Sequence, residues 1–326
     1  MDSRGAHIQA VRGMPGVVRA RFRKRATVSA LVALLLFGLV YWLMVRTQTG
    51  QRFEDAVLAG ALEYRDRAER GAAEGRLRAI SLATIGAGCV GVLLIAAIRH
   101  RRLAGVAGVC TIVGAMGVAE VLKRYVVTRP ALYGQTDPPV PVHNSFPSGH
   151  TAIATSLLFA LIIVAAPRWR GLAAAFGALW TVGIGASTVT AHWHRPADTF
   201  GGNLIAFAVG ALALAALAAL GRGAPAVTGP RLLLRLPTFA LAGTACVGTV
   251  LAGLFLWMYA RDRTTPALPA DADWEAYLAG QSLASAFGAL TALAMLSLVR
   301  RWDPSAPDQP RPWLPMPAAE TPAARR

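Results

Sequence analysis

The sequence predicts an all-α fold, a polytopic transmembrane helical bundle with about eight spans. Of its 326 residues, 55% are hydrophobic and only 15% are charged, whereas water-soluble domains average about 25% charged residues. The apolar residues form runs of about 20, long enough to cross roughly 30 Å of hydrocarbon as a helix. The net charge of +16 comes from residues between these runs. A single soluble domain and a mostly disordered chain are therefore excluded.

Seven of the eight expected spans contain no Asp, Glu, Lys or Arg, and the third carries only Glu120, near its end. The first follows the basic stretch Arg19 to Arg25 but is longer than the apolar core of a secretory signal, about 7–15 residues, so we expect a retained helix. Glycine and alanine are frequent in the third and sixth spans and predict close helix packing. The spans are residues 27–45, 79–98, 103–122, 151–166, 171–191, 199–220, 238–260 and 280–299.

The placement of basic residues predicts the orientation of the chain. If the N-terminus is cytoplasmic, the segments on that side hold 20 Lys and Arg against 4 Asp and Glu, and the opposite side holds 13 of each. The whole net charge then lies on one face, as the positive-inside rule expects. We therefore predict a multi-pass protein of the cell's inner (plasma) membrane with both termini cytoplasmic, and no nucleic-acid partner.

The segments between and beyond the spans complete the expected domain organisation. Residues 51–70 carry apolar side chains at helical spacing among many charges, which predicts an amphipathic helix along the outer membrane surface. The three cysteines fall in apolar stretches and suggest neither disulfides nor a metal site. The expected parts are a basic cytoplasmic tail (1–26), a six-span core (27–222), two additional transmembrane helices (223–300) and a disordered Pro/Ala-rich cytoplasmic tail (301–326).

Polar residues converge on two outer loops of this topology. Four of the six histidines fall there: His143 and His150 between spans three and four, and His192 and His194 between spans five and six. The first loop also carries Lys123, Arg124 and Arg129, and the second carries Arg195 and Asp198. We therefore expect one polar site at the outer membrane surface.

The first loop ends with Pro147-Ser148-Gly149-His150, directly before the fourth span. Ser148 can cap that helix, and Gly149 lets a ligand approach the backbone. The free amides of a first helical turn form an anion site. His150, in that turn, is placed to give a proton to a departing oxygen.

In the second loop, Pro196 suits the first position of a helix. Asp198 follows His194 by four residues, so its carboxylate can hold one nitrogen of the imidazole and leave the other free to attack. Spans four and six present their positive N-terminal ends to the same face. With Lys123 and Arg129, they favour phosphorus chemistry.

These residues resemble the type-2 phosphatidic acid phosphatase superfamily, whose pattern is Lys-x6-Arg-Pro, Pro-Ser-Gly-His and Ser-Arg-x5-His-x3-Asp. The resemblance covers roughly residues 27–220. It implies that His194 is a nucleophile forming a phosphohistidine, that Asp198 orients it and that His150 protonates the leaving group. It also implies that no metal or other cofactor takes part. The phosphate ligands that it implies are Lys123, Arg129, Ser148, Gly149 and Ser187.

The chain departs from this pattern at two positions. Only five residues separate Lys123 from Arg129, and Thr188 stands where the pattern has arginine. Loss of one hydrogen bond from a charged group costs about 1.5–3 kcal/mol of binding free energy. Arg195 and Arg124 are the candidates to replace that contact.

The function that follows is an integral membrane lipid phosphatase. Its expected partners are the bilayer and a lipid phosphate, such as a polyprenyl (for example undecaprenyl) diphosphate, phosphatidate or phosphatidylglycerol phosphate. A lipid phosphotransferase remains open, as does a non-catalytic lipid-binding or transport protein, although transporters usually carry ionisable groups at mid-bilayer. Zinc binding by His192 and His194 is disfavoured because no cysteine accompanies them. Glu120 is expected to pair with Lys123 or Arg124. The oligomeric state is not predicted.

Overall fold

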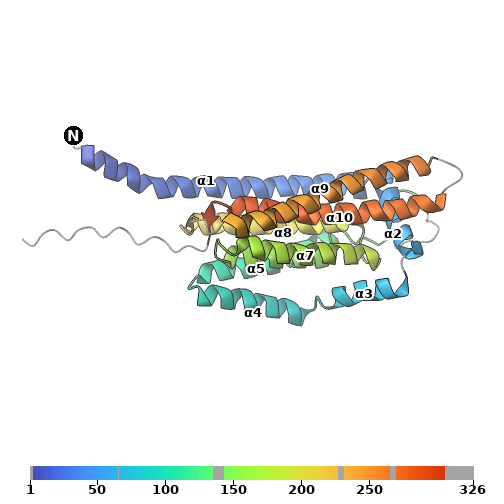
Figure 1. The fold of residues 1–326 in the computed structure, drawn as a ribbon, viewed down its shortest axis with the longest axis horizontal. Helices are drawn as coiled ribbons and strands as arrows, with labels where there is room; N and C mark the ends of the chain where they lie inside the picture. The colour runs from blue at the N-terminus through green and yellow to red at the C-terminus, as the bar shows by residue number, and fades with distance from the viewer. Residues whose placement is uncertain (1–2, 65, 135–142, 227–230, 265–268, 305–326) are drawn as a thin grey trace, which may run out of the picture.

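Long helices, running roughly parallel or antiparallel to one another, make up the protein (Figure 1). The computed structural model describes residues 3–64, 66–134, 143–226, 231–264 and 269–304. Most of the expected tail 301–326 therefore lies outside the described residues. The α-helices are α1 (Ser3–Val40), α2 (Gln48–Tyr64), α3 (Arg67–Arg78), α4 (Leu82–Ile98), α5 (Arg102–Val121), α6 (Gly149–Val164), α7 (Arg170–Thr190), α8 (Pro196–Ala219), α9 (Arg231–Asp262) and α10 (Pro269–Val299).

Two π-helical turns and one small sheet complete the described structure. The π-helical turns η1 (Tyr41–Val45) and η2 (Leu122–Val126) extend α1 and α5. Strand β1 (Ala224–Pro225) pairs antiparallel with β2 (Trp302–Asp303). Helix α1 begins at Ser3, so the expected basic tail is helical over most of its length.

Six of the described helices are long and apolar enough to cross a membrane, and the chain is accordingly a membrane protein. These segments are Gly16–Val45, Arg102–Val126, Arg170–Thr190, Pro196–Ala219, Arg235–Asp262 and Ala272–Val299. Helices α3 and α4 pass the same test only as one span bent by 53°, and α6 is a shorter apolar helix. All eight expected spans thus coincide with helices. Six of these helices are by themselves long and apolar enough to cross a membrane.

Helix starts follow the local sequence signals. Ser81 and Thr84 form a reciprocal capping box at the start of α4, and the Asp66 side chain caps α3. Ser148 caps α6 by accepting the amide N–H of Thr151. Pro196 occupies the first turn of α8, as predicted.

Helix α8 lies at the centre of the bundle, in contact with α1, α5, α6 and α10. Its small residues allow this close packing: a Cβ on Gly202 would stand 2.6 Å from the Ser148 carbonyl oxygen, and one on Gly210 would stand 3.2 Å from the Phe159 ring. The packing predicted from glycine and alanine is confirmed for α8, and α8 is held against the start of α6.

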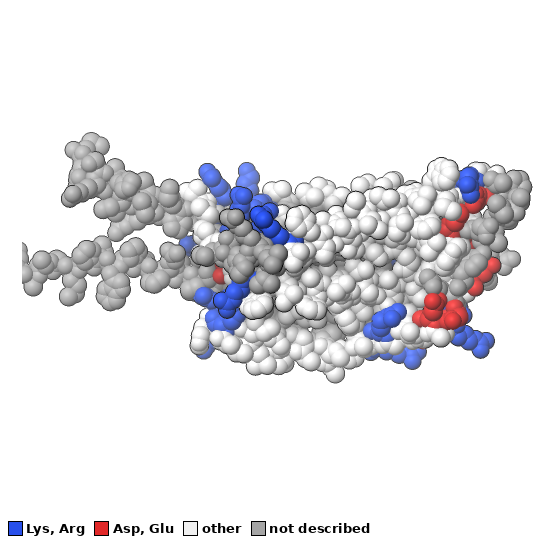
Figure 2. Space-filling model, viewed as in Figure 1, with Lys and Arg blue, Asp and Glu red and all other residues white. Residues whose placement is uncertain are grey.

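The two ends of the bundle differ in charge. On the face in Figure 2, Lys and Arg gather near one end, and Asp and Glu gather near the other together with further Lys and Arg. The band between them is largely free of both on that face. At the basic end, buried Arg170 pairs with Asp303 of β2 at 2.6 Å. This ion pair attaches the start of α7 to the small sheet.

The expectation for residues 51–70 requires a correction. Two helices occupy these residues, since α2 ends at Tyr64 and α3 begins at Arg67, and α2 is covered by the protein on most sides instead of having one solvated face: Val57 and Leu58 are buried, and Phe53 contacts Tyr259 of α9 edge to face. Its acidic residues Glu54 and Asp55 are also buried, because basic side chains from elsewhere in the chain are there to pair with them.

Candidate functional site

The predicted site residues come together at one end of the bundle, where α5 and α7 end and α6 and α8 begin (Figure 1). The two motif loops are joined through their backbones, since the amide of Ser148 donates to the carbonyl oxygen of Asp198 at 2.8 Å. The close approach at Gly202 keeps the two helix starts together. Residues 50 positions apart thus form one site.

His194 and Asp198 have the contact that their spacing predicts. Nδ1 of His194 lies 3.2 Å from Oδ2 of Asp198, and both side chains are buried. The same oxygen accepts the Ser145 hydroxyl at 2.5 Å and the Arg195 amide at 2.9 Å. Because these bonds fix the carboxylate and occupy Nδ1, Nε2 is the ring nitrogen left for a substrate. Ser145 was not among the predicted site residues.

His150 faces His194 across the site. The two ring centroids are 6.1 Å apart, and the His150 ring also meets Trp193 edge to face at 5.3 Å. Burial, then the nearby His194 and Lys123, lower the pKa of His150 to about 4. A bound anion would act in the opposite direction, because negative charge stabilises the protonated imidazole.

Lys123 reaches over the first turn of α6. Its Nζ lies 3.9 Å from the position that a Cβ on Gly149 would take, and 3.6 Å from Oε2 of Glu120. Lys123 belongs to η2, and such widened turns often occur at functional sites. Ammonium group and helix start together offer a place for an anion.

Arg129 is buried beside Asp198, with Nη2 3.9 Å from Oδ1 of the aspartate. Its closest partner is Glu54, at 2.6 Å. Nε and Nη1 of Arg129 and Oδ1 of Asp198 are buried without hydrogen-bond partners in the described part of the chain. Two unused donors on a buried guanidinium suit an anionic ligand.

Ser187 and Thr188 are engaged within the protein. The Ser187 hydroxyl donates to the carbonyl oxygen of Gly183 at 2.7 Å and accepts Nε of Arg76 at 2.9 Å. Thr188 is buried, with its hydroxyl bound to the carbonyl oxygen of Gly185. Its own carbonyl accepts the amides of Trp193 and His194 at 3.0 and 3.1 Å. Thr188 therefore holds the turn that carries His194.

The acidic pair of α2, Glu54 and Asp55, was not among the predicted site residues. Glu54 accepts Arg129 and, at 2.8 Å, the Ala197 amide in the first turn of α8. Asp55 accepts Arg195 at 2.8 Å and the hydroxyl of Tyr133. Complete burial raises the pKa of Glu54 to about 7, although the charge of Arg129 acts in the opposite direction. The sequence signal that could have identified them is the position of two acidic residues directly beside the apolar residues of the helix predicted over 51–70.

The two arginines considered as replacements at position 188 have other partners. Arg195 is buried and bound to Asp55. Arg124 is exposed, with Nε 2.5 Å from Glu120. The prediction that Glu120 pairs with Lys123 or Arg124 is confirmed, and the structure has both contacts. His143 is exposed, and His192 has its Nε2 buried with no partner among the described residues.

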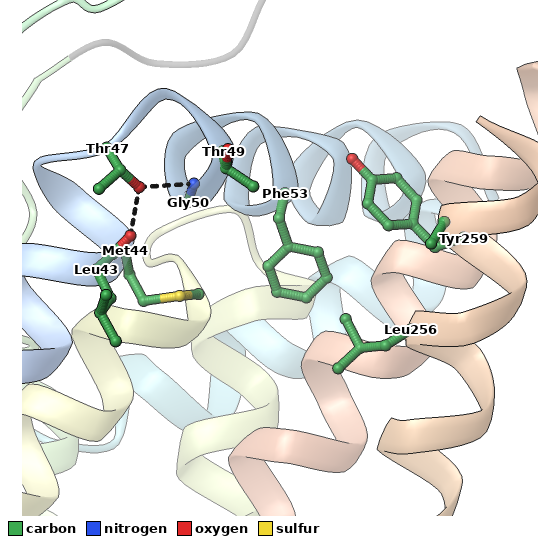
Figure 3. A pocket seen from close by; sticks show the side chains of 9 residues that line it. Leu43, Met44, Thr47, Thr49, Gly50, Phe53, Leu256 and Tyr259 are labelled. Atoms are coloured by element: carbon green, nitrogen blue, oxygen red, sulfur yellow. Dashed lines mark hydrogen bonds between the residues drawn. The ribbon is translucent and has the colours of Figure 1, made fainter. Parts of the chain in front are cut away.

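A separate cavity of about 500 Å³ lies between η1, α2 and α9 (Figure 3). The rings of Phe53 and Tyr259 border it, and the Thr47 hydroxyl bridges Leu43 to Gly50 at its rim. Its lining includes no predicted site residue and, apart from Tyr259, no titratable side chain. This cavity therefore lacks the groups expected of a phosphate site, which gather around His150 and His194.

In the part of the chain that the structure describes, no three His, Cys, Asp or Glu side chains are grouped so that they could hold a metal ion. Residues 103–222 match the family model of the PAP2 superfamily. This segment is shorter than the expected core 27–222 and contains all of the predicted site residues. Neither a curated protein nor a solved structure matches the chain.

Proposed function

Because residues 103–222 match the PAP2-superfamily model within a bundle of apolar helices, we propose that the protein is a membrane phosphatase that hydrolyses a lipid phosphate. The substrate is a phosphomonoester or diphosphate, such as a polyprenyl diphosphate, phosphatidate or phosphatidylglycerol phosphate. The observation that carries the proposal is the pair of imidazoles 6.1 Å apart, one of them held by a buried aspartate.

In the first step, Nε2 of His194 attacks phosphorus while the bond from phosphorus to the lipid oxygen breaks. His150 gives its proton to that oxygen, so the lipid leaves as an alcohol or, from a diphosphate, as a monophosphate. The negative charge of the phosphate favours protonated His150 and so opposes the burial that lowers its pKa. General acid catalysis of this kind contributes about 10²–10⁴-fold.

In the second step, water attacks the phosphohistidine. His150, now neutral, accepts a proton from the water, the bond from phosphorus to Nε2 breaks, and inorganic phosphate leaves. Asp198 keeps the imidazole oriented through both steps. Lys123, the unused donors of Arg129 and the first-turn amides of α6 stabilise the oxygens of phosphorus as their charge changes. No step needs a metal ion.

The proposed location is the outer face of the plasma membrane. The site lies at the end of the bundle opposite the start of α1 and the sheet of β1 and β2. The segments at that other end carry the excess of Lys and Arg, and the positive-inside rule places such segments in the cytoplasm. The phosphate group would then be presented from the outer leaflet.

The test is phosphate release by the purified full-length protein from vesicles that contain each candidate lipid. We expect release by the wild type and its loss in His194→Ala, with activity retained in His143→Ala, which removes an exposed histidine. A ³²P label should appear as an acid-labile phosphohistidine in the wild type and in His143→Ala, and should be absent from His194→Ala. Undiminished release by His194→Ala would refute the proposed nucleophile, and phosphorylated lipid or sugar products would indicate a transferase.

A further inference from the structure

We propose that Arg76, on α3 and outside the segment that matches the family model, is a phosphate-binding residue of this site. The inference rests on the proposed function, because it assigns Arg76 to the same phosphate. Thr188 stands where the family pattern has an arginine and carries no positive charge. Arg76 would supply the missing cationic contact with the phosphate.

The geometry places Arg76 beside the turn that carries the nucleophile. Its Nε donates to Oγ of Ser187 at 2.9 Å. The next residue, Thr188, accepts the amide of His194 at 3.1 Å. One side-chain hydrogen bond and one turn of backbone therefore connect the Arg76 guanidinium to His194.

Packing fixes α3 in this position. Ala73 and Leu77, which flank Arg76 on the helix, are buried in one apolar cluster with Ala154 of α6 and Ile184 of α7. Trp193 packs against that cluster and also meets the His150 ring. Helix α3 thus borders the site from the side of α7.

The charge balance distinguishes Arg76 from the other cations that the prediction considered. Arg129 is paired with Glu54 at 2.6 Å, Arg195 with Asp55 at 2.8 Å, and Lys123 with Glu120 at 3.6 Å. Arg76 is exposed, and within the described residues its hydrogen bond goes to a neutral hydroxyl and it forms no ion pair. Its positive charge is therefore available to a dianion.

The chemistry of guanidinium suits this arrangement. Nε is held by Ser187, and the two terminal nitrogens have no hydrogen-bond partner among the described residues, so they can donate to two oxygens of one phosphate group. A lysine at this position would keep the charge but not this pair of parallel bonds. Arg76→Lys should therefore recover only part of the function.

The experiment compares Arg76→Ala, Arg76→Lys and the control Arg78→Ala in the full-length protein. Arg78 is exposed on the same helix and pairs with Glu74, so it reports general surface charge. The readouts are binding of inorganic phosphate by calorimetry, KM and kcat for the lipid substrate, and the melting temperature. Guanidinium ion is then added to Arg76→Ala at millimolar concentration.

We expect Arg76→Ala to weaken phosphate binding and raise KM by roughly 10- to 100-fold, with Arg76→Lys between it and the wild type. Guanidinium should restore part of the binding, which a purely structural role would not allow. Phosphate binding equal to that of Arg78→Ala, an unfolded Arg76→Ala combined with a fully active Arg76→Lys, or no phosphate binding by the wild type would overturn the proposal. Arg76-dependent phosphate binding without lipid turnover would support it while refuting the proposed function.

Discussion

The helices that precede the matched segment and the motifs inside it contribute to the site in different ways. The motifs act over short distances in the sequence: Asp198 holds His194 four residues away, and Ser148 caps the amide three residues later. Helices α2 and α3 reach the site over separations of 75 to 143 residues, through Glu54, Asp55 and Arg76. In the proposed mechanism the motifs supply the reacting groups, whereas α2 and α3 place charged side chains around them.

The two helices also differ from each other. The acidic residues of α2 are buried and neutralise Arg129 and Arg195, while the basic residues of α3 are largely exposed. A buried charge must be paired to be tolerated, and an exposed one need not be. Substitutions in α2 should therefore affect stability most, and substitutions in the motifs should affect turnover most.

The largest effect is expected for the motif residue His150. We expect His150→Gln to lower kcat by about 10²–10⁴-fold, because the leaving oxygen loses its proton donor. Stability should change little, since the side chain is only partly buried. Steady-state phosphate release and thermal unfolding in detergent measure the two quantities. A variant with wild-type kcat would contradict the assignment of His150 as the acid.

Glu54 tests the contribution of α2. Glu54→Ala leaves buried Arg129 without its closest partner, and removal of one member of a buried pair destabilises by about 3–5 kcal/mol. The matched control is Glu74→Ala, whose partner Arg78 is exposed, and there we expect less than about 1 kcal/mol. The free energy of unfolding is measured in detergent. An equal decrease in the two variants would show that the buried pair stabilises the protein no more than the exposed pair does.

Gly202 tests how closely the two motif helices must approach. Gly202→Ala brings a methyl group to 2.6 Å from the Ser148 carbonyl oxygen, and overpacking of this kind is worth about 1–3 kcal/mol. Turnover should fall as well, because α8 carries Asp198. Gly117→Ala is the control, since a Cβ there meets no atom within 4 Å. Comparable behaviour of the two variants would argue against a required close approach.

The smallest effect is expected from the titration of His192. Burial, then the charges of Arg70 and Arg195, lower the pKa of His192 to about 4. The unfolded chain binds this proton near pH 6.5 and the folded chain does not, so stability falls as the pH drops from about 6.5 to 4. His192→Asn should remove part of that loss, about 1 kcal/mol at most because the ring is partly exposed.

Asparagine is chosen because residue 192 has φ 64°, and asparagine tolerates this left-handed conformation. His100→Asn is the control: it also has positive φ, at 55°, and is exposed. Melting temperatures of both variants and the wild type from pH 4 to 7 provide the measurement. An unchanged pH dependence in His192→Asn would exclude His192 as its source.

Much of the site could be predicted because its decisive contacts are local. The spacing of His194 and Asp198 on a helix start predicts their hydrogen bond, and Pro196 and Ser148 mark where α8 and α6 begin. Ser145 and Glu54 could not be found in this way. Their contacts with Asp198 and Arg129 depend on chain folding over 53 and 75 residues, for which no local periodicity exists.

The sequence by itself determined the apolar helices, their starts and the pairing of residues one helical turn apart, because hydrophobic length, capping and helical spacing act locally. Only the tertiary structure decided that α2 is buried, that Glu54 and Asp55 neutralise Arg129 and Arg195, and that Arg76 contacts Ser187. The physical reason is that a charge is stabilised by whichever opposite charge or dipole is near it in space, and distance along the chain does not specify that partner.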